Sequence, residues 1–221
     1  MSKDLLEKGG ILQRDKETYA IAPHIPGGIT TPTMLRKLAD VAEKYNAAAL
    51  KITSAQRIAI VGLPADKLDE IWSVLGEKPG AAIGLCVRSV KICPGTTFCK
   101  KGQQDSVTVG LDLDKRYHGF ELPWKFKMGV SGCMNDCAET CIKDIGLVGK
   151  PKGWTIKVGG TGGGIARLSK PLVEDIATNE DALAIIDKIV NWFKEQGKVG
   201  RLGKIIEDTG GMDNFKAAIL K

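Results

Sequence analysis

Two short cysteine pairs constrain this chain more than any other feature. The first pair, Cys93-x5-Cys99, lies in a loop rich in proline and glycine, and the second, Cys133-x3-Cys137, follows Gly-Val-Ser-Gly. Each pair offers two soft thiolates, and 33 residues separate the pairs, so two loops that fold together would present four thiolates to one metal centre. The pattern therefore favours a four-thiolate iron–sulfur site.

Other uses of these cysteines stay open at this point. Structural zinc sites prefer two to four residues between paired cysteines, and five is wide for such a knuckle. A disulfide framework needs an oxidising compartment, whereas the amino terminus has no apolar signal-peptide core and no stretch is long enough to span a bilayer. We expect a cytoplasmic protein without a membrane segment, and we keep zinc and unliganded core thiols as alternatives.

The distribution of charge indicates the kind of partner. The net charge is +6, and residues 78–104 contain five basic residues and no acidic one. This positive field would attract an anionic substrate or an acidic protein. Aromatic residues make up only 5% of the chain, and no nucleic-acid-binding motif is present, so nucleic acid is not an expected partner.

Hydrophobic spacing predicts two domains of an α+β protein. The first reads as strand, helix, strand, strand, helix, with strands at 19–23, 48–53 and 57–61 and helices at 31–45 and 64–75. A proline and a glycine at residues 79–80 and a shift in composition place the boundary near residue 76, giving domains 1–76 and 77–221. The first domain is predicted to be a ferredoxin-like α/β layer.

The second domain contains all six cysteines. Alternation predicts strands at 107–113, 125–130 and 154–158, and helical spacing predicts helices at 179–196 and 213–220. Cys133, Cys137 and Cys141 are four residues apart, so a helix there would place them on one face, with Asn135 and Asp136 turned elsewhere.

Several blocks together resemble the siroheme-dependent sulfite and nitrite reductases, and the likeness covers about residues 10–170. They are Ile25-Pro-Gly-Gly28, Lys51-Ile-Thr-Ser-Ala-Gln-Arg57, Arg88-x4-Cys93-x5-Cys99, Gln104-Asp-Ser106, Leu122-Pro-Trp-Lys-Phe-Lys127 and Gly129-Val-Ser-Gly-Cys-Met-Asn-Asp-Cys137.

This resemblance implies a ferredoxin-like half-domain followed by an α/β domain that binds siroheme and a 4Fe-4S cluster. The implied cluster ligands are Cys93, Cys99, Cys133 and Cys137, with Cys137 bridging to the siroheme iron. The implied reaction is the six-electron reduction of sulfite to sulfide, with reduction of nitrite to ammonia as the alternative. Because no flavin or nicotinamide motif is present, the electrons would come from an acidic carrier such as ferredoxin. An electron-transfer protein with the cluster but no siroheme is a further alternative.

Cations near the cysteines are the candidate substrate-binding groups. In the family, an arginine and two lysines at the positions of Arg88, Lys125 and Lys127 bind the oxyanion and deliver protons. The two lysines alternate in the predicted strand, which would direct both to one face. A lysine beside like charges has a lowered pKa, which makes it a better proton donor at neutral pH.

Other residues are candidates for holding the cofactor. Thr53, Gln56 and Arg57 resemble a family block that binds the siroheme carboxylates, which suit a guanidinium. Asn135 lies within the second cysteine block. The glycine-rich run would let backbone approach the macrocycle, and its candidates are Gly160, Thr161, Gly162, Gly163 and Arg167.

The chain departs from its relatives in three places. His24 stands where many relatives have an arginine that contacts the substrate, and since a histidine is charged only below pH ~6.5, we hypothesise that it makes substrate binding steeper with pH. The module occurs once instead of twice, so a second subunit related by a two-fold axis is hypothesised to complete the pocket. Cys86 and Cys141 match no family role. A buried core thiol is the expectation for Cys86, and Cys141 is expected to be a core thiol or a spare ligand.

Overall fold

The computed structural model describes residues 3–221. They form two compact units, the first ending at Gly84 and the second beginning at Leu85, and each packs around its own hydrophobic core. The predicted boundary near residue 76 stays a prediction. Among the described residues, no helix has the length and apolar character needed to cross a membrane.

Unit 1 contains a four-stranded antiparallel sheet in the order β1-β2-β4-β3. Its elements are η1 (Leu6–Lys8), β1 (Ile11–Leu12), β2 (Tyr19–Ile21), η2 (Pro26–Gly28), α1 (Pro32–Lys44), β3 (Ala49–Ile52), β4 (Ile58–Leu63), η3 (Ala65–Lys67) and α2 (Leu68–Leu75). The order predicted for a ferredoxin-like half-domain is confirmed, with the short β1 added at one edge.

Local chemistry explains why these helices begin and end where they do. Thr31 caps α1, because its side-chain oxygen accepts the Met34 N–H at 3.2 Å, and Pro32 occupies the first helical position. Gly76 ends α2 in the left-handed conformation, with φ of 71°. Leu38 of α1 and Trp72 of α2 are buried in the same core as the strands.

Unit 2 contains a five-stranded sheet in the order β5-β6-β7-β8-β9. Strands β5, β6 and β7 are parallel, and β8 and β9 continue the sheet antiparallel. The elements are β5 (Val87–Ile92), α3 (Gly95–Phe98), α4 (Ser106–Tyr117), β6 (Phe126–Ser131), η4 (Thr140–Ile142), β7 (Ile145–Lys150), β8 (Gly153–Val158), β9 (Lys170–Ile176), α5 (Asn179–Gln196), α6 (Leu202–Asp208) and α7 (Gly211–Ile219).

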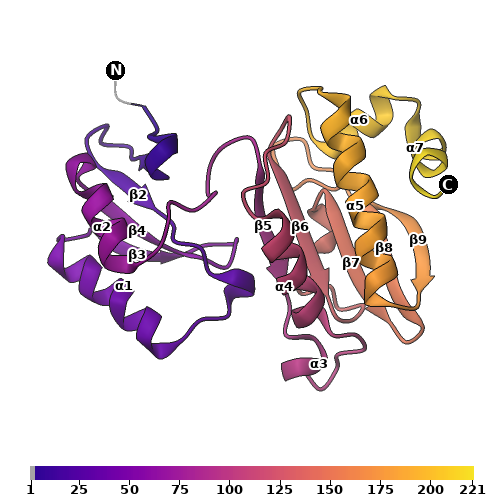
Figure 1. Cartoon of the computed structure of the whole chain (residues 1–221), viewed down its shortest axis with the longest axis horizontal. Helices are drawn as coiled ribbons and strands as arrows, with labels where there is room; N and C mark the ends of the chain where they lie inside the picture. Colours follow the sequence, from indigo (N-terminus) through magenta and orange to yellow (C-terminus); the bar gives the residue numbers. More distant parts are fainter. Residues whose placement is uncertain (1–2) are drawn as a thin grey trace. The chain divides into compact units, whose positions relative to one another are not determined.

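The two faces of this sheet have different surroundings. Helices α4 and α5 lie across one face (Figure 1), where Phe126 of β6 packs on Phe193 of α5 with ring centroids 5.2 Å apart. Alternate residues of β6 point the other way. There the segment around η4 approaches so closely that a side chain at Gly129 would meet the Ala138 carbonyl at 3.1 Å. The opposite face is therefore covered at Gly129 by the segment from Ala138 to Lys143.

One strand predicted in unit 2 is a helix, and the helix considered for the cysteine segment does not form. Residues 107–113 form part of helix α4 instead of a strand, because the Asp105 carboxylate caps it by accepting the N–H groups of Val107 and Thr108. The segment from Cys133 to Cys141 is a series of turns instead of a helix, so its cysteines do not form a helical stripe.

Candidate active site

The two cysteine loops leave neighbouring parallel strands at the same edge of the sheet. Cys93 directly follows β5, and Cys133 lies two residues beyond β6. The Cys93 N–H donates to the Val130 carbonyl at 3.0 Å, and the Gly132 N–H donates to the Cys93 sulfur at 3.0 Å. Because the carboxyl ends of parallel strands meet at one edge, the fold itself brings the two pairs together.

Backbone contacts hold these loops in place. The N–H groups of Gln103 and Gln104 both donate to the Gly132 carbonyl, at 2.8 and 3.0 Å. A side chain at Gly102 would come within 2.5 Å of the Gly95 backbone, and one at Gly132 within 2.6 Å of the Gln104 carbonyl. The glycines of both cysteine blocks are thus required for the loops to pack backbone against backbone.

Asp136 organises the turn between Cys133 and Cys137. Its carboxylate accepts the N–H of Thr140 at 2.8 Å, the N–H of Cys141 at 3.1 Å and the hydroxyl of Ser131 at 3.0 Å. Burial raises the pKa of Asp136, but these hydrogen bonds outweigh burial and leave the pKa below its ordinary value. Asp136 has φ of 52°, a left-handed conformation that aspartate tolerates.

The four thiols that would hold a cluster differ in exposure, and all of them are free cysteines. Cys93 is buried, Cys99 and Cys133 are half-buried and Cys137 is exposed. Within residues 3–221, no three of the His, Cys, Asp and Glu side chains converge closely enough to hold one metal ion. Four cysteine thiols are the donor set of a 4Fe-4S cluster, with one thiolate for each iron.

Several cations surround Lys127 on the face of β6 opposite α4 and α5, the face over which the segment from Cys137 to Lys143 folds back. Lys127 of β6 is half-buried there. Burial lowers its pKa, and the charges of Arg201, Lys143 and Arg88 lower it further, while Asp144 opposes them. The predicted lowering of the Lys127 pKa is confirmed in direction, although burial is the main cause and Lys125 is not among the neighbours responsible.

Asp144 and Arg201 form a buried ion pair next to Lys127. Asp144 is fully buried, and the Arg201 guanidinium donates to both of its carboxylate oxygens, from Nε at 2.8 Å and Nη2 at 2.7 Å. The remaining guanidinium nitrogen donates to the Thr161 hydroxyl at 3.0 Å. Burial raises the pKa of Asp144, and the bond to Arg201 opposes that rise.

Two lysines form ion pairs with Glu139, which follows Cys137 in the cysteine turn. Glu139 accepts an ion pair from Lys91 at 2.9 Å and from Lys143 at 3.2 Å. Lys91 lies in β5 just before Cys93, and Lys143 follows η4. The cationic face is therefore richer than predicted, and its cations are Arg88, Lys91, Lys127, Lys143 and Arg201.

The glycine-rich run forms a loop between β8 and β9. Gly160 is buried, and a side chain there would meet the Cys141 carbonyl at 2.6 Å, so this glycine packs against the chain's own backbone. Thr161 pairs with Arg167 through two backbone hydrogen bonds of 2.9 Å each. Gly162 and Gly163 lie exposed at the tip, and the roles of all these residues toward a cofactor stay predictions.

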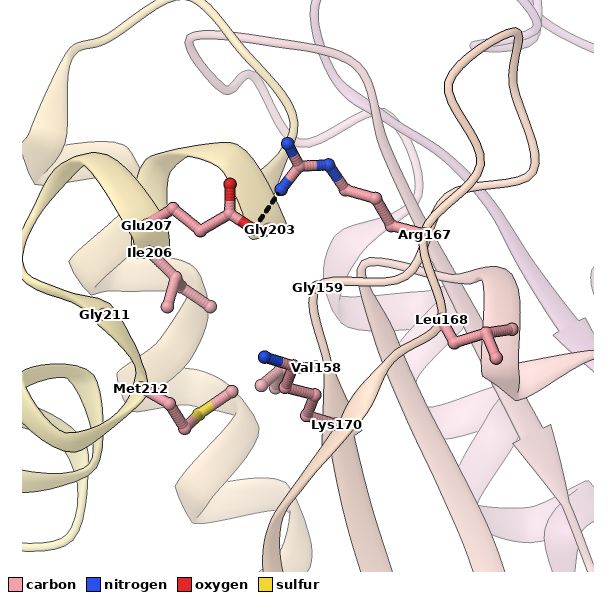
Figure 2. A pocket seen from close by; sticks show the side chains of 10 residues that line it. All are labelled: Val158, Gly159, Arg167, Leu168, Lys170, Gly203, Ile206, Glu207, Gly211 and Met212. Atoms are coloured by element: carbon pink, nitrogen blue, oxygen red, sulfur yellow. Dashed lines mark ion pairs between the residues drawn. The ribbon is translucent and has the colours of Figure 1, made fainter.

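Arg167 borders a cavity of about 420 Å³. Its guanidinium forms an ion pair of 2.5 Å with Glu207 of α6, and Figure 2 shows this pair at one side of the cavity. The lining residues are Val158, Gly159, Arg167, Leu168, Lys170, Gly203, Ile206, Glu207, Gly211 and Met212.

The candidates in unit 1 lie in two segments that contact each other. Thr53 and Arg57 close the β3–β4 hairpin, with the Thr53 N–H donating to the Arg57 carbonyl at 2.8 Å. Arg57 is buried at 3% exposure. A side chain at Gly28 would meet Gln56 at 2.9 Å, so the Ile25–Gly28 block packs on this hairpin. His24, two residues before η2, is half-buried.

The other predicted residues are placed as follows. Arg88 is half-buried in β5, and Asn135 is exposed in the cysteine turn. Strand β6 begins at Phe126, one residue later than predicted, so Lys125 lies just before the ladder and its shared face with Lys127 stays a prediction. Cys86 is buried, as expected for a core thiol, and Cys141 is half-buried.

Sequence reasoning missed Asp136, Glu139, Lys143, Asp144 and Arg201. Asp144 directly precedes the apolar run of β7, and an acid at the start of a buried strand is a local signal that it needs a partner. Nothing local identifies Arg201 as that partner, because the two residues are 57 positions apart.

Two family models together match most of the chain. Residues 11–78 match the nitrite/sulfite reductase ferredoxin-like half domain, and residues 83–221 match the nitrite and sulphite reductase 4Fe-4S domain.

Individual relatives differ in how much of them this chain spans. An assimilatory-type sulfite reductase from Nitratidesulfovibrio vulgaris is 42% identical over 96% of this chain and 97% of the relative. A Bacillus subtilis nitrite reductase [NAD(P)H] is 40% identical over 83% of this chain but only 23% of its own length. The chain therefore corresponds to a whole protein in the first case and to about a quarter of one in the second.

Solved structures share the fold at low sequence identity. A dissimilatory sulfite reductase I superposes with a TM-score of 0.80 at 17% identity, covering 92% of this chain and 69% of that one. The NirA protein of Mycobacterium tuberculosis superposes with a TM-score of 0.77 at 20% identity, covering 91% and 39%. The α+β fold expected from the sequence is confirmed.

Proposed function

This chain belongs to the family of nitrite and sulphite reductases, and from that premise we propose that it reduces sulfite to sulfide with six electrons from an external carrier. The observation that carries the proposal is that the turn following Cys133 and Cys137 folds back over the cationic face of β5 and β6, where Glu139 of the turn pairs with Lys91 and Lys143. An oxyanion and a redox centre would meet there. Sulfite is preferred over nitrite because the relative of matching length is an assimilatory-type sulfite reductase.

The chain's residues fit both cofactors of the family. We assign Cys93, Cys99, Cys133 and Cys137 to the 4Fe-4S cluster, with Cys137, the exposed one, shared with siroheme. Taking each unit by itself, we propose Arg57 in unit 1, and Arg167 with the exposed Gly162–Gly163 tip in unit 2, as the groups that would bind siroheme carboxylates. When bound, the coupled centre supplies the iron that takes the oxyanion and the electrons that reduce it.

The chain itself supplies anion binding and protons. Arg88, Lys125 and Lys127 would hold the oxyanion, and the positive field of their neighbours would raise its local concentration. The lowered pKa of Lys127 brings its ammonium closer to a useful proton donor at neutral pH. Each oxygen lost from sulfite as water consumes two protons, and Lys127 is the residue best placed by charge and burial to deliver them.

Two partners belong to the same proposal. Exposed Lys100 and Lys101, which follow Cys99, give the cluster loop a positive surface suited to an acidic electron carrier such as ferredoxin. A second copy of the chain is proposed to complete the site that longer relatives build from two modules.

The test is oxidation of reduced methyl viologen by the anaerobically purified holoenzyme, with sulfite and nitrite compared in parallel. The proposal predicts a higher kcat/KM for sulfite. A higher kcat/KM for nitrite would instead support the second candidate function, reduction to ammonia, which the nitrite reductases among the relatives favour. No turnover of either oxyanion by a siroheme-containing preparation would contradict both.

A further inference from the structure

The Asp144 carboxylate binds the backbone of Lys127 as well as Arg201. The Lys127 N–H donates to Asp144 Oδ2 at 2.8 Å, and the Asp144 N–H donates to the Lys127 carbonyl at 3.0 Å. These bonds lie just before the regular β6–β7 ladder, which begins at Met128 and Ile145. The backbone position of Lys127 at the start of β6 is therefore fixed by the same carboxylate that orients the Arg201 guanidinium.

Arg201 connects three parts of unit 2. It occupies the position just before α6, and its guanidinium reaches the carboxylate between β6 and β7 and the Thr161 hydroxyl of the glycine-rich loop. A guanidinium held by both oxygens of a buried carboxylate has little freedom to move. Its charge thus stays at one fixed position relative to Lys127.

The charged groups that act on Lys127 come from every segment around it. Arg88 lies on β5, Lys143 follows η4, and Arg201 lies at the start of α6. Among these cations, Arg201 has the largest effect on Lys127, and Asp144 is the carboxylate that opposes them. Arg201 therefore lowers the pKa of Lys127, and Asp144 raises it.

We propose that Arg201 and Asp144 are positioning residues for Lys127: Asp144 fixes its backbone and the Arg201 guanidinium, and together the two charges set how readily the Lys127 ammonium releases a proton. The inference deepens the proposed function, since it concerns the proton donor of that reaction. The pair has no contact with substrate and is not itself catalytic.

The test uses the apo protein, so that it does not depend on turnover. Lysines are trace-labelled with acetic anhydride across about pH 7 to 11, spanning the ordinary lysine pKa, and each site is quantified by peptide mass spectrometry. Only the neutral amine reacts, so the pH midpoint for Lys127 reports its protonation independently of its accessibility. Exposed Lys152, in the turn between β7 and β8, provides an internal reference.

Opposite shifts are the decisive result. Arg201→Gln removes the cation and should move the Lys127 midpoint to higher pH, whereas Asp144→Asn removes the carboxylate and should move it to lower pH. Arg201→Lys keeps the charge and should stay nearest to wild type. Arg116→Gln, which breaks an exposed ion pair with Asp187 on helix α5, is the matched control and should leave the midpoint unchanged.

Other outcomes would overturn the inference. A general loosening of the site would expose Lys127 and move its midpoint upward in both the Arg201→Gln and Asp144→Asn variants. An unchanged midpoint in folded variants would make the pair purely structural. If Arg201→Gln does not fold, the Lys127 midpoint in Asp144→Asn still tests the inference, because only the proposed electrostatic effect moves it to lower pH. Failure here would leave the proposed function intact, and loss of sulfite turnover in the holoenzyme would not affect this measurement.

Discussion

At the scale of single residues, Lys127 is the proposed proton donor, and the charges around it lower its pKa. Lys127→Met should reduce turnover of sulfite about a hundredfold, the size expected for loss of a proton donor. The measurement is kcat with reduced methyl viologen. Lys152→Met, in an exposed turn, is the control and should keep wild-type kcat. A Lys127→Met enzyme with normal kcat would remove Lys127 from the mechanism.

The same residue predicts a dependence of stability on pH. Since the folded-state pKa of Lys127 is lowered, the unfolded chain binds more protons between that value and the ordinary value near ~10.4. Its contribution therefore opposes folding at neutral pH and disappears as the pH rises through this window. In urea titrations at pH 7, apo Lys127→Met should be at least as stable as wild type, with its advantage lost toward pH 11. A less stable variant at pH 7 would contradict this.

Asp136 is predicted to hold the cysteine turn before any cluster binds. Asp136→Ala leaves the N–H groups of Thr140 and Cys141 without their acceptor, which should lower the free energy of unfolding of the apo protein by about 2 kcal/mol. Asp136→Asn keeps one acceptor oxygen and should lose less. Asp208→Ala, which breaks an exposed ion pair with Lys204, is the control and should change stability little. Equal stabilities for all three variants would contradict the account.

Residue types and spacing predicted much of this site but not its support. The cysteine pairs and Lys127 could be recognised because each of them belongs to a short sequence motif. Arg201 and Lys143 could not, since their roles arise only when distant segments meet. The cations that lower the pKa of Lys127 could not be named in advance for the same reason, since they come from other elements.

At the scale of elements, alternation misidentified α4 because its apolar residues satisfy two patterns. Val107, Val109 and Leu113 alternate over a short stretch, but the buried positions continue at helical spacing to Tyr117. The Asp105 cap decides between the patterns. Strands β5, β7 and β9 were not predicted, because none of them alternates cleanly: β7 is an almost continuous apolar run, whereas β5 and β9 have charged residues between irregularly spaced buried positions.

A hydrogen bond between Tyr117 and Asp187 links α4 to α5. Burial and then this bond raise the pKa of Tyr117, so the residue contributes stability that is present below the ordinary value near ~10 and is lost as the pH rises above it. Tyr117→Phe should cost about 1 kcal/mol at neutral pH, and the deficit should shrink above pH ~10. Urea titrations at pH 7 and pH 10.5 measure both, and a deficit that grows with pH would contradict the assignment.

At the scale of the whole molecule, a single module raises the question of a second subunit. We expect sedimentation velocity on the holoenzyme to give twice the mass of one chain, because we propose that a second copy completes the site. A sedimentation mass of one chain at micromolar concentration would reject the homodimer, and the pocket would then be built from one chain alone.

The central claim is that one short chain holds a coupled siroheme and 4Fe-4S centre. The most direct test is an iron assay with an absorption spectrum on anaerobically purified protein. The account predicts about five irons per chain together with siroheme bands. Four irons without haem bands would indicate an electron carrier, and a colourless protein containing zinc would contradict the account altogether.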